Sequence, residues 1–526
     1  MNKLYYGDNL EVLRTLFSDE SVDLIYLDPP FNSQASYNVL FRGADGHQSQ
    51  AQVEAFEDSW HWGEGTEQAF EEIVHSSQVH AAELIRSLRQ FLGENDMMAY
   101  LVMMAVRLVE LHRVLKSTGT IYLHCDPTAS HYLKLVLDAI FGVKNFRNEI
   151  SWRRSNPKSH GRHNFANCRD VILRYTKSDE FTFNPIYGEH EQSYVEKAYR
   201  HRDPDGRSYR LLPLLNPNDD RPNLTYEFLG VTRVWRWTKA RMQKAYEEGL
   251  VVQLKPGAVP QYKKYLEDSK GRTISNDWSD ISPIGSSEEL GYPTQKPVAL
   301  LERVIQASSR EGEIVLDPFC GCGTAIHAAE KLRRRWAGID ITHLSISLVE
   351  RRLREAFPKI GFETVGTPRD VEGAIALANA DKYQFQWWAV SLVDAMPYGG
   401  KKKGADGGID GLIYFRTDRK VTNKAVVSVK GGAKLSVTMI RELAHVVERA
   451  DAKIGLLVCL AKPTSEMKKE AAAAGFYVTD YGQYPKIQIL TVEELLNGSH
   501  PRLPLIDPSS FKKTQAEVRS TQPKLF

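Results

Sequence analysis

A short motif near the start of the chain combines a carboxylate with two prolines and an aromatic ring. The tetrapeptide Asp-Pro-Pro-Phe at residues 28–31 directly follows an apolar run at residues 22–27. Because proline continues neither a strand nor a helix, we expect a buried strand that ends at this motif. The alternative, which turn chemistry alone leaves open, is that the prolines only end the strand and form a turn.

The chemistry that this motif suits is the activation of an exocyclic base amine. The lone pair of such an amine is delocalised into the ring, so the nitrogen is a poor nucleophile. A carboxylate that accepts one N–H and a backbone carbonyl that accepts the other draw the nitrogen toward a nucleophilic geometry. The prolines would fix that carbonyl, and a flat ring would stack on an extruded base. The candidate catalytic residues are therefore Asp28, Pro29, Pro30 and Phe31.

A glycine-rich turn much later in the chain predicts a ligand site at the end of another strand. Phe319, Gly321 and Gly323 lie between an apolar run at residues 313–316 and an expected helix at residues 324–332. Glycines at such a turn allow the backbone to approach a ligand closely and expose the helix N-terminus.

An acidic residue strengthens this prediction. Asp340 ends the next expected strand, 17 positions after Gly323, where a carboxylate accepts the hydroxyls of a ribose in a doubly wound fold. A nicotinamide cofactor would require a third glycine, but Ile326 follows instead. Cys320 and Cys322 have a metal-like spacing without a second cysteine or histidine pair nearby, so packing of small residues is favoured over a metal site.

These motifs need a sheet that brings the ends of their strands together. Residues 1–150 and 291–365 alternate apolar runs with helical periodicity, which is typical of an α/β fold. Residues 151–290 lose this pattern and are rich in Arg, Asn, Pro, Trp and Tyr. A smaller α/β unit is expected at residues 380–497, and the polar tail at residues 498–526 is expected to be partly disordered.

Together, these motifs resemble the S-adenosylmethionine-dependent DNA methyltransferases that modify exocyclic amines. The resemblance rests on residues 28–31, the Phe319-x-Gly321-x-Gly323 turn and Thr-Gln-Lys-Pro at residues 294–297. The catalytic motif precedes the cofactor motif, as in the β class of that family, with a target-recognition insert between them. The resemblance implies a Rossmann-like doubly wound sheet with both motifs at the carboxyl ends of parallel strands. It also implies S-adenosylmethionine as cofactor, bound by Asp317, Phe319, Gly321, Gly323, Thr324 and Asp340, with Thr294 and Lys296 beside its methionine moiety.

The identity of position 28 bears on the base that would be modified. Aspartate there, rather than serine, resembles the adenine-N6 enzymes more than the cytosine-N4 enzymes. The implied function is methyl transfer to N6 of adenine in DNA, by base flipping and direct transfer, within a restriction–modification system. Cytosine-C5 chemistry needs a cysteine nucleophile, and no cysteine here follows a proline. Cytosine-N4 methylation, a chain that also cleaves DNA, and a catalytically silent DNA-binding module stay open as alternatives.

Basic residues in the insert predict contact with double-stranded DNA. The segment at residues 151–163 is basic and nearly free of acidic residues, which suits binding to phosphates. For the run at residues 239–244, a solvated charged face is an equal alternative. The candidate DNA-binding residues are Arg153, Arg154, Lys158, Arg162, Arg233 and Arg236.

The unit at residues 380–497 resembles the PD-(D/E)xK nuclease fold in its Mrr-like restriction endonuclease form. Asp410 precedes an expected strand at residues 412–415, and Lys430 ends a second one at residues 424–430. The resemblance implies that Asp410 ligates a divalent metal such as Mg²⁺ and that Lys430 assists the attacking water.

One position departs from that nuclease pattern. Ser428 stands where the family carries an acid or glutamine, so one metal ligand is missing unless Glu442 or Asp406 supplies it. An active nuclease, a DNA-binding relic and an ordinary solvated loop beside core strands are the three interpretations of this unit.

Composition sets the limits of these interpretations. The 526 residues include 68 Lys+Arg and 66 Asp+Glu, for a formal net charge of +2, with 42% hydrophobic residues. This is the composition of a globular protein and excludes wholesale disorder. The longest apolar run, residues 454–461, is far shorter than the ~20 residues of a membrane span, and the first residues lack the apolar core of a signal peptide. We therefore expect a cytoplasmic protein that does not bind membranes, with a second copy or a restriction subunit as the two kinds of protein partner.

Overall fold

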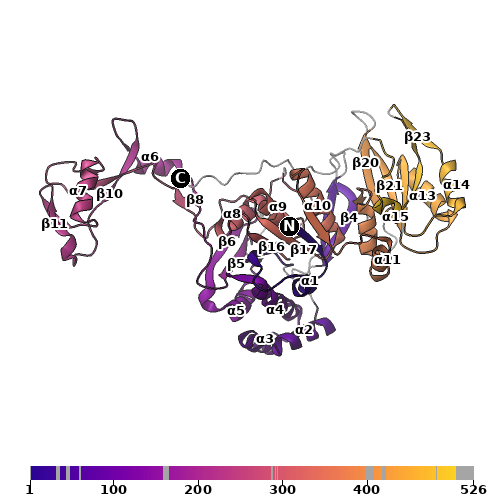
Figure 1. Cartoon of the computed structure of the whole chain (residues 1–526), viewed down its shortest axis with the longest axis horizontal. Helices are drawn as coiled ribbons and strands as arrows, with labels where there is room; N and C mark the ends of the chain where they lie inside the picture. The colour runs from indigo at the N-terminus through magenta and orange to yellow at the C-terminus, as the bar shows by residue number, and fades with distance from the viewer. Residues whose placement is uncertain are drawn as a thin grey trace. The chain divides into compact units, whose positions relative to one another are not determined.

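The structure is a computed structural model. It describes residues 2–30, 36–42, 48–57, 61–157, 165–285, 288–290, 292, 294–398, 408–416, 422–480 and 482–504. The chain divides into two compact units, and residues 185–275 form the second of them. The first unit contains the main sheet and, further along the chain, a smaller C-terminal domain (Figure 1).

The main sheet has eight strands among the described residues, in the order β18-β1-β17-β16-β2-β5-β7-β6. The five neighbouring pairs from β18 to β5 are parallel, whereas β7 is antiparallel to both β5 and β6. The sheet is therefore of the doubly wound, Rossmann-like type with antiparallel strands at one side. The strands are β1 (Asn2–Tyr6), β2 (Val22–Leu27), β5 (Leu115–Cys125), β6 (Phe146–Arg153), β7 (Arg169–Thr176), β16 (Ile314–Asp317), β17 (Arg335–Asp340) and β18 (Phe362–Val365).

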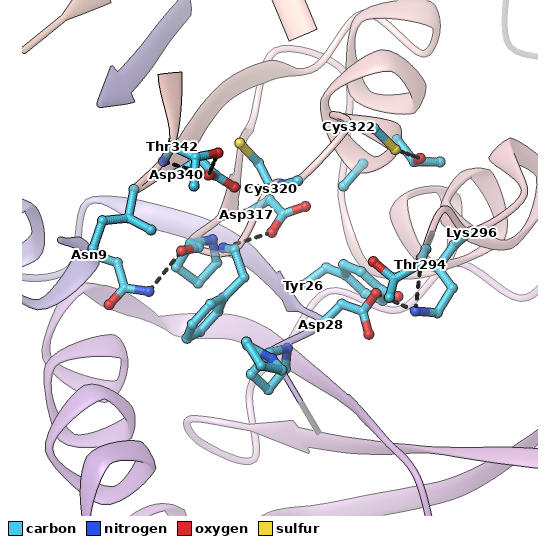
Figure 2. Close-up of a pocket in the computed structure, with 18 of the residues that line it drawn as sticks. Asn9, Tyr26, Asp28, Thr294, Lys296, Asp317, Cys320, Cys322, Asp340 and Thr342 are labelled. Carbon is cyan, nitrogen blue, oxygen red and sulfur yellow. Dashed lines mark hydrogen bonds and ion pairs between the residues drawn. The ribbon is translucent and has the colours of Figure 1, made fainter. Parts of the chain in front are cut away.

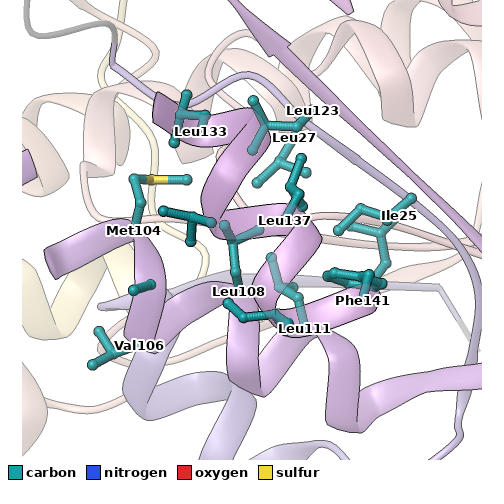
Figure 3. Close-up of a cluster of buried hydrophobic side chains, with 14 of the residues drawn as sticks. Ile25, Leu27, Met104, Val106, Leu108, Leu111, Leu123, Leu133, Leu137 and Phe141 are labelled. Carbon is teal, nitrogen blue, oxygen red and sulfur yellow. The ribbon is translucent and has the colours of Figure 1, made fainter. Parts of the chain in front are cut away.

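Helices cover both faces of this sheet (Figure 1). Alternate residues of β2 and β5, such as Ile25, Leu27 and Leu123, pack with α1, α4 and α5 in one apolar cluster (Figure 3). Helices α8 and α9 pack together, and α8 contacts β2 and β5 whereas α9 contacts β16 and β17. The helices of this part are α1 (Asn9–Leu16), α2 (Glu64–Val74), α3 (Val79–Leu92), α4 (Asp96–Val114), α5 (Ser130–Phe141), η1 (Val143–Asn145), α8 (Val298–Ser308), α9 (Thr324–Lys331) and α10 (His343–Ala356), beside the hairpin β3 (Ser36–Arg42) and β4 (Gln48–Glu57).

The turns that contain the two sequence motifs lie at the carboxyl ends of the parallel strands. Strand β2 ends before Asp28 because two prolines follow that residue. Strands β16 and β17 end at Asp317 and Asp340. Since β16 pairs with both β2 and β17 in parallel, all three ends lie at the same edge of the sheet.

The second unit has its own small core. Its four-stranded sheet has the order β13-β14-β10-β9, and Trp235 and Met242 lie fully buried in its apolar cluster. This unit is shorter than the insert predicted at residues 151–290, because β6 and β7 pair within the main sheet. Its elements are β8 (Tyr187–Gly188), α6 (Gln192–Ala198), β9 (His201–Arg202), β10 (Ser208–Pro213), η2 (Pro222–Leu224), β11 (Thr225–Phe228), β12 (Val231–Val234), α7 (Lys239–Glu247), β13 (Val251–Val252), β14 (Gln261–Tyr265) and β15 (Arg272–Thr273).

The C-terminal domain is a five-stranded sheet, in the order β19-β20-β21-β22-β25, with an apolar cluster on each face. Strands β20 and β21 are antiparallel neighbours, as the nuclease-like interpretation requires. The elements are α11 (Val371–Ala380), α12 (Lys382–Ser391), β19 (Met396–Pro397), β20 (Gly411–Arg416), β21 (Thr422–Lys430), α13 (Val437–Arg449), β22 (Ile454–Cys459), α14 (Ser465–Ala473), β23 (Phe476–Thr479), β24 (Gly482–Pro485), β25 (Ile487–Thr491) and α15 (Val492–Leu496).

Within the described part of the chain, no helix combines the length and the apolar character that crossing a membrane requires. Of the tail predicted at residues 498–526, residues 505–526 lie outside the described residues.

Candidate active site

A cavity opens at the carboxyl ends of β1, β2, β16 and β17 (Figure 2). It collects most of the residues that the two sequence motifs single out. Those predicted residues are Asp28, Pro29, Pro30, Thr294, Lys296, Asp317, Phe319, Gly321, Thr324 and Asp340. The two motifs are thus brought to one site although almost three hundred positions separate them in the chain.

The Asp28 carboxylate lies at the floor of this cavity with its two oxygens in different environments. Oδ2 forms a short ion pair with the Lys296 ammonium, and both side chains are mostly buried (Figure 2). Oδ1 is buried and has no hydrogen-bond partner among the described residues. Because a buried carboxylate oxygen is costly to leave unpaired, Oδ1 is an acceptor that awaits a donor in the cavity.

The cavity is rich in negative charge. The described residues that line it include four carboxylates and two cationic side chains. Burial, reinforced by the charge of Asp28, raises the pKa of Asp317 well above its ordinary value. A cationic ligand would lower the free energy of the ionised form of Asp317, so this cavity favours ligands that carry positive charge.

The glycine turn shapes the opposite side of the cavity. Gly321 and Gly323 have φ of +48° and +74°, values that favour glycine, and Gly323 is the N-cap residue of α9. The Gly321 N–H donates to Asp340 Oδ2 at 2.9 Å, and the N–H of Thr342 donates to Asp340 Oδ1 at 2.9 Å. The Thr342 hydroxyl also donates to Oδ1, at 3.0 Å, so Oδ2 is the oxygen of Asp340 that keeps a lone pair for a ligand hydroxyl.

The side chain of Thr324 is engaged elsewhere. Its hydroxyl accepts a hydrogen bond from the guanidinium of Arg352 at 3.1 Å, and the same Arg352 nitrogen donates to the carbonyl of Cys322 at 3.0 Å. Thr324 therefore fixes the turn between β16 and α9. Cys320 and Cys322 are buried, and their burial raises the pKa of both thiols.

Several lining residues were not identified as site residues from the sequence. Asp8 caps α1 by accepting from the N–H of Leu10, and its carboxylate pairs with Arg107 at 2.8 Å. Asn9 accepts from Arg107 at 2.6 Å and donates to the carbonyl of Pro318 at 2.9 Å. The signal for Asp8 and Asn9 was present, since a Gly-Asp-Asn turn follows an apolar stretch, but Arg107 lies inside a helix with no local mark.

Two tyrosines also line the cavity and were not predicted from the sequence. Tyr26 precedes Asp28 by two positions on β2, and Tyr292 packs so close to Gly321 that a Cβ there would lie 3.2 Å from its ring. Both are buried, and a buried tyrosine is typical of core packing, so its residue type alone did not distinguish it.

The remaining predicted residues lie outside this cavity or outside the described residues. Phe31, Lys158, Arg162 and Asp406 belong to the latter group. Arg153 and Arg154 are exposed at the end of β6, and Arg233 and Arg236 are exposed in the second unit. Across the described ranges, no group of three or more His, Cys, Asp or Glu residues is arranged to hold a metal ion.

Among the residues that the structure describes, the nuclease-like candidates belong to no group of this kind. Asp410 directly precedes β20, and its Oδ2 accepts a hydrogen bond from the backbone N–H of Val429 at 2.6 Å. Ser428 and Lys430 follow one another on alternate positions of β21, and Glu442 is exposed on α13. The Asp410 carboxylate therefore helps to join β20 to β21.

The fold and the cavity define a doubly wound α/β protein with its ligand site at the carboxyl ends of the parallel strands. Residues 22–351, more than half of the chain, match the model of the N6/N4 methyltransferase family, whose description is DNA methylase. The chain belongs to this DNA methylase family. Residues 391–497 match a second model, the NACHT-associated inactive restriction endonuclease 1.

Similar proteins come from restriction–modification systems. The type II methyltransferase M.EcaI of Enterobacter cloacae is 32% identical over 260 residues, 48% of this chain and 57% of that protein. The Mod subunit of the type III restriction-modification enzyme StyLTI of Salmonella typhimurium is 28% identical over 359 residues, 64% of this chain and 51% of that protein. The chain thus spans little more than half the length of these relatives. The solved PvuII DNA methyltransferase, which is cytosine-N4-specific, aligns with a TM-score of 0.33 and 12% identity over 66% of this chain and 86% of its own.

Proposed function

We propose that this chain transfers a methyl group from S-adenosylmethionine to an exocyclic amine of DNA, with N6 of adenine as the acceptor. The observation that carries the proposal is the unpaired buried Oδ1 of Asp28, next to a rigid proline turn and at the same edge of the sheet as the glycine turn. Family membership and the names of the relatives support the reaction class.

The chain's own groups would activate the amine. Oδ1 of Asp28 would accept one N–H, and a backbone carbonyl of the proline turn would accept the other. Lys296 holds Oδ2 and so keeps the carboxylate in one orientation. The two acceptors would stabilise the positive charge that develops on the nitrogen as it is alkylated, and would direct the departing proton away from the base.

The cavity also suits the cofactor. S-adenosylmethionine supplies, when bound, an electrophilic methyl group on a positively charged sulfur. Asp317, whose pKa burial raises well above its ordinary value, would be ionised by the positive charges of the methionine part. Oδ2 of Asp340 would accept a ribose hydroxyl, and the first residues of α9, which follow Gly323, line the same cavity.

The preference for adenine rests on the aspartate at position 28. Adenine-N6 and cytosine-N4 have the same chemistry at the amine, so the cavity alone does not separate them. The base is read directly by expressing the chain in bacteria that lack DNA methylation and sequencing modified bases. N6-methyladenine in a defined sequence context supports the proposal, whereas N4-methylcytosine contradicts the choice of base.

Replacement of Asp28 by alanine is the first testable prediction. We expect Asp28→Ala to lower the rate of labelled methyl transfer by about 10²–10³-fold, because it removes an acceptor that acts on developing charge. Binding of S-adenosylmethionine, measured by calorimetry, should change little. The matched control is Asp19→Ala, since Asp19 is an exposed carboxylate paired with Arg113 away from the cavity. Near-normal turnover of Asp28→Ala would overturn the catalytic assignment.

The second proposed element is a C-terminal domain that does not cleave DNA. Its support is the match to an inactive endonuclease model and the use of the Asp410 carboxylate by a backbone N–H. We expect no cleavage of unmethylated plasmid in Mg²⁺. Cleavage by the wild-type chain that is lost in Lys430→Ala would restore the bifunctional alternative.

A further inference from the structure

A chain of buried polar side chains runs across the main sheet to the floor of the cavity. The Tyr26 hydroxyl lies 2.8 Å from Nδ1 of His124, and Nε2 of His124 lies 3.1 Å from Oδ2 of Asp170. Nη1 of Arg154 lies 3.1 Å from Oδ1 of Asp170. Tyr26, His124 and Asp170 have exposed fractions of 2%, 0% and 1%, and they come from β2, β5 and β7.

The ionised carboxylate of Asp170 sets the direction of its hydrogen bond with His124. Burial works to raise the pKa of Asp170, but the hydrogen bond and charge of His124 hold it below its ordinary value, so Asp170 is ionised. An ionised carboxylate only accepts, so Nε2 of His124 carries the hydrogen. Nδ1 of His124 and the Tyr26 hydroxyl form the next hydrogen bond of the network, in which either atom is able to donate. Burial and the nearby Asp28 raise the pKa of Tyr26, which keeps that hydroxyl protonated.

Burying such a network costs folding free energy, so the need for a stable core does not by itself explain it. Each buried polar group loses its hydration, and apolar side chains of similar volume fill a core without that loss. The indole of Trp152 adds to the restraint, because its ring meets the His124 imidazole edge-on at 5.8 Å between centroids. Oδ1 of Asp170 has the ion pair with Arg154 but, within the described part of the chain, no hydrogen bond, whereas the two hydrogen bonds of His124 hold Tyr26, His124 and Asp170 in one orientation.

The member at the end of the network lies beside the reacting groups. Tyr26 lines the cavity and shares the face of β2 with Asp28, because the two residues are two positions apart on an extended segment. Figure 2 shows Tyr26 next to Asp28 and Lys296. The orientation of Tyr26 therefore determines the shape of the cavity at the catalytic carboxylate.

We propose that Tyr26, His124 and Asp170 are positioning residues for methyl transfer, and that Arg154 completes this relay at the start of the predicted DNA-binding segment. The proposal rests on the proposed function, because it assigns the relay to the site of Asp28. The relay fixes the wall of the base-binding part of the cavity, so that the target amine meets Asp28 in one geometry. It predicts an effect on turnover and none on cofactor binding.

A matched pair of tyrosines provides the test. Tyr122 is the cross-strand partner of Tyr26, is equally buried, and bonds through its hydroxyl to Ser308 at 2.7 Å, outside both the relay and the cavity. We expect Tyr26→Phe to lower kcat about tenfold, since small displacements at a reacting centre are amplified in rate. Its KM for DNA, its dissociation constant for S-adenosylmethionine and its melting temperature should match those of Tyr122→Phe, whose kcat stays at the wild-type value.

A double-mutant cycle tests whether the residues act as one relay. Asp170→Asn keeps the shape of the side chain and still offers an oxygen to His124, so it should retain more activity than Asp170→Ala. If Tyr26 acts through Asp170, the combined Tyr26→Phe and Asp170→Asn variant should lose no more turnover than the more damaging single variant.

The outcomes separate this proposal from the proposed function. Equal kcat in Tyr26→Phe and Tyr122→Phe, with an active wild type, overturns the relay alone. Additive losses in the cycle overturn the linkage through Asp170. A wild-type chain that binds S-adenosylmethionine but methylates no DNA overturns the proposed function and the relay together. Because Tyr26→Phe removes a single oxygen, a folding defect in the Asp170 variants does not remove the test.

Discussion

The environments of the two Asp28 oxygens depend on residues that are distant in the sequence. One oxygen is held by Lys296, which lies 268 positions away, and the other is buried and faces the cavity. The sequence predicted both residues as members of the site, yet in separate roles. Their ion pair had no local signal, because it depends on how the turn before α8 folds over β2.

The other residues of the cavity also divide into those with a local signal in the sequence and those whose role depends on long-range contacts. Asp317, Gly321 and Asp340 were predictable as candidates because the two aspartates end expected strands and Gly321 follows one of them in a glycine-rich turn. Tyr26 and Arg107 were not, because a tyrosine in a strand and an arginine in a helix acquire a role only through long-range contacts.

A buried histidine beside this site predicts how stability depends on pH. The His343 imidazole stacks on Tyr6 with 3.7 Å between ring centroids, and burial lowers the pKa of His343 to about 3. Below pH ~6.5 the unfolded chain takes up a proton that the folded chain does not, so stability is full above that pH and is lost as the pH falls, by about 1.4 kcal/mol per unit. His343→Phe keeps a ring in place and removes this dependence.

The measurement is the free energy of unfolding in urea at pH 7 and at pH 5. We expect the wild-type chain to lose about 2 kcal/mol more than His343→Phe between the two values. Burial also lowers the pKa of His112, to about 4, but His112 is present in both proteins and its contribution cancels. Equal losses in the two proteins would contradict the assignment.

At the scale of elements, the turn between β16 and α9 is the most constrained connection of the site. Gly323 has φ +74°, and a Cβ there would lie 2.8 Å from Cγ2 of Val349. We expect Gly323→Ala to cost about 1–3 kcal/mol of stability and to weaken cofactor binding, because the turn carries the N–H of Gly321. Thermal unfolding and calorimetric binding of S-adenosylmethionine measure the two effects.

Two control variants separate the causes. Gly361→Ala introduces the same methyl group where no heavy atom lies within 4 Å, and it should be close to neutral. Adding Val349→Ala to Gly323→Ala relieves the contact but leaves the backbone conformation, so full recovery would show that the contact alone is responsible.

The elements themselves were largely predictable where the pattern is local. The strand predicted at residues 22–27 is β2, and the helix predicted at residues 324–332 is α9, one residue shorter. Arg169–Thr176 lies within the range predicted as the insert, and in the structure it forms β7 of the main sheet. The polar residues around this segment obscure its alternation of apolar and polar side chains. Its pairing with β5 joins parts of the chain that are far apart in the sequence, so it leaves no local signal.

At the scale of the whole molecule, both units carry exposed arginines that the sequence predicted to bind DNA. A protein that lacks one phosphate-binding arginine releases about one counterion fewer when it binds DNA. The slope of the logarithm of the DNA-binding constant against the logarithm of the salt concentration should therefore become shallower by ~0.9. We expect this for Arg153→Gln and, separately, for Arg233→Gln, both exposed. Salt titrations of DNA binding by fluorescence anisotropy provide the measurement.

The control for this experiment is Arg310→Gln. Arg310 is exposed and precedes the start of β16, at the sheet edge opposite the cavity, so its loss should leave the slope unchanged. A slope that is unaffected in the Arg153 and Arg233 variants as well would remove these residues from the DNA-binding surface.

The strand order of the main sheet also determines when its parts are able to pair during translation. Strands β1 and β2 are consecutive in the chain, but β17 and β16 lie between them in the sheet, and the bonded pair Asp23 and Ile314 is 291 positions apart. At ~5–20 residues per second, the gap in the sheet stays open for about 15–60 s of translation. During that time the edges of β1 and β2 that face the gap have no partner strand. The unit at residues 185–275 is complete before the gap closes, so this part of the chain has time to fold before the cavity at the strand ends exists.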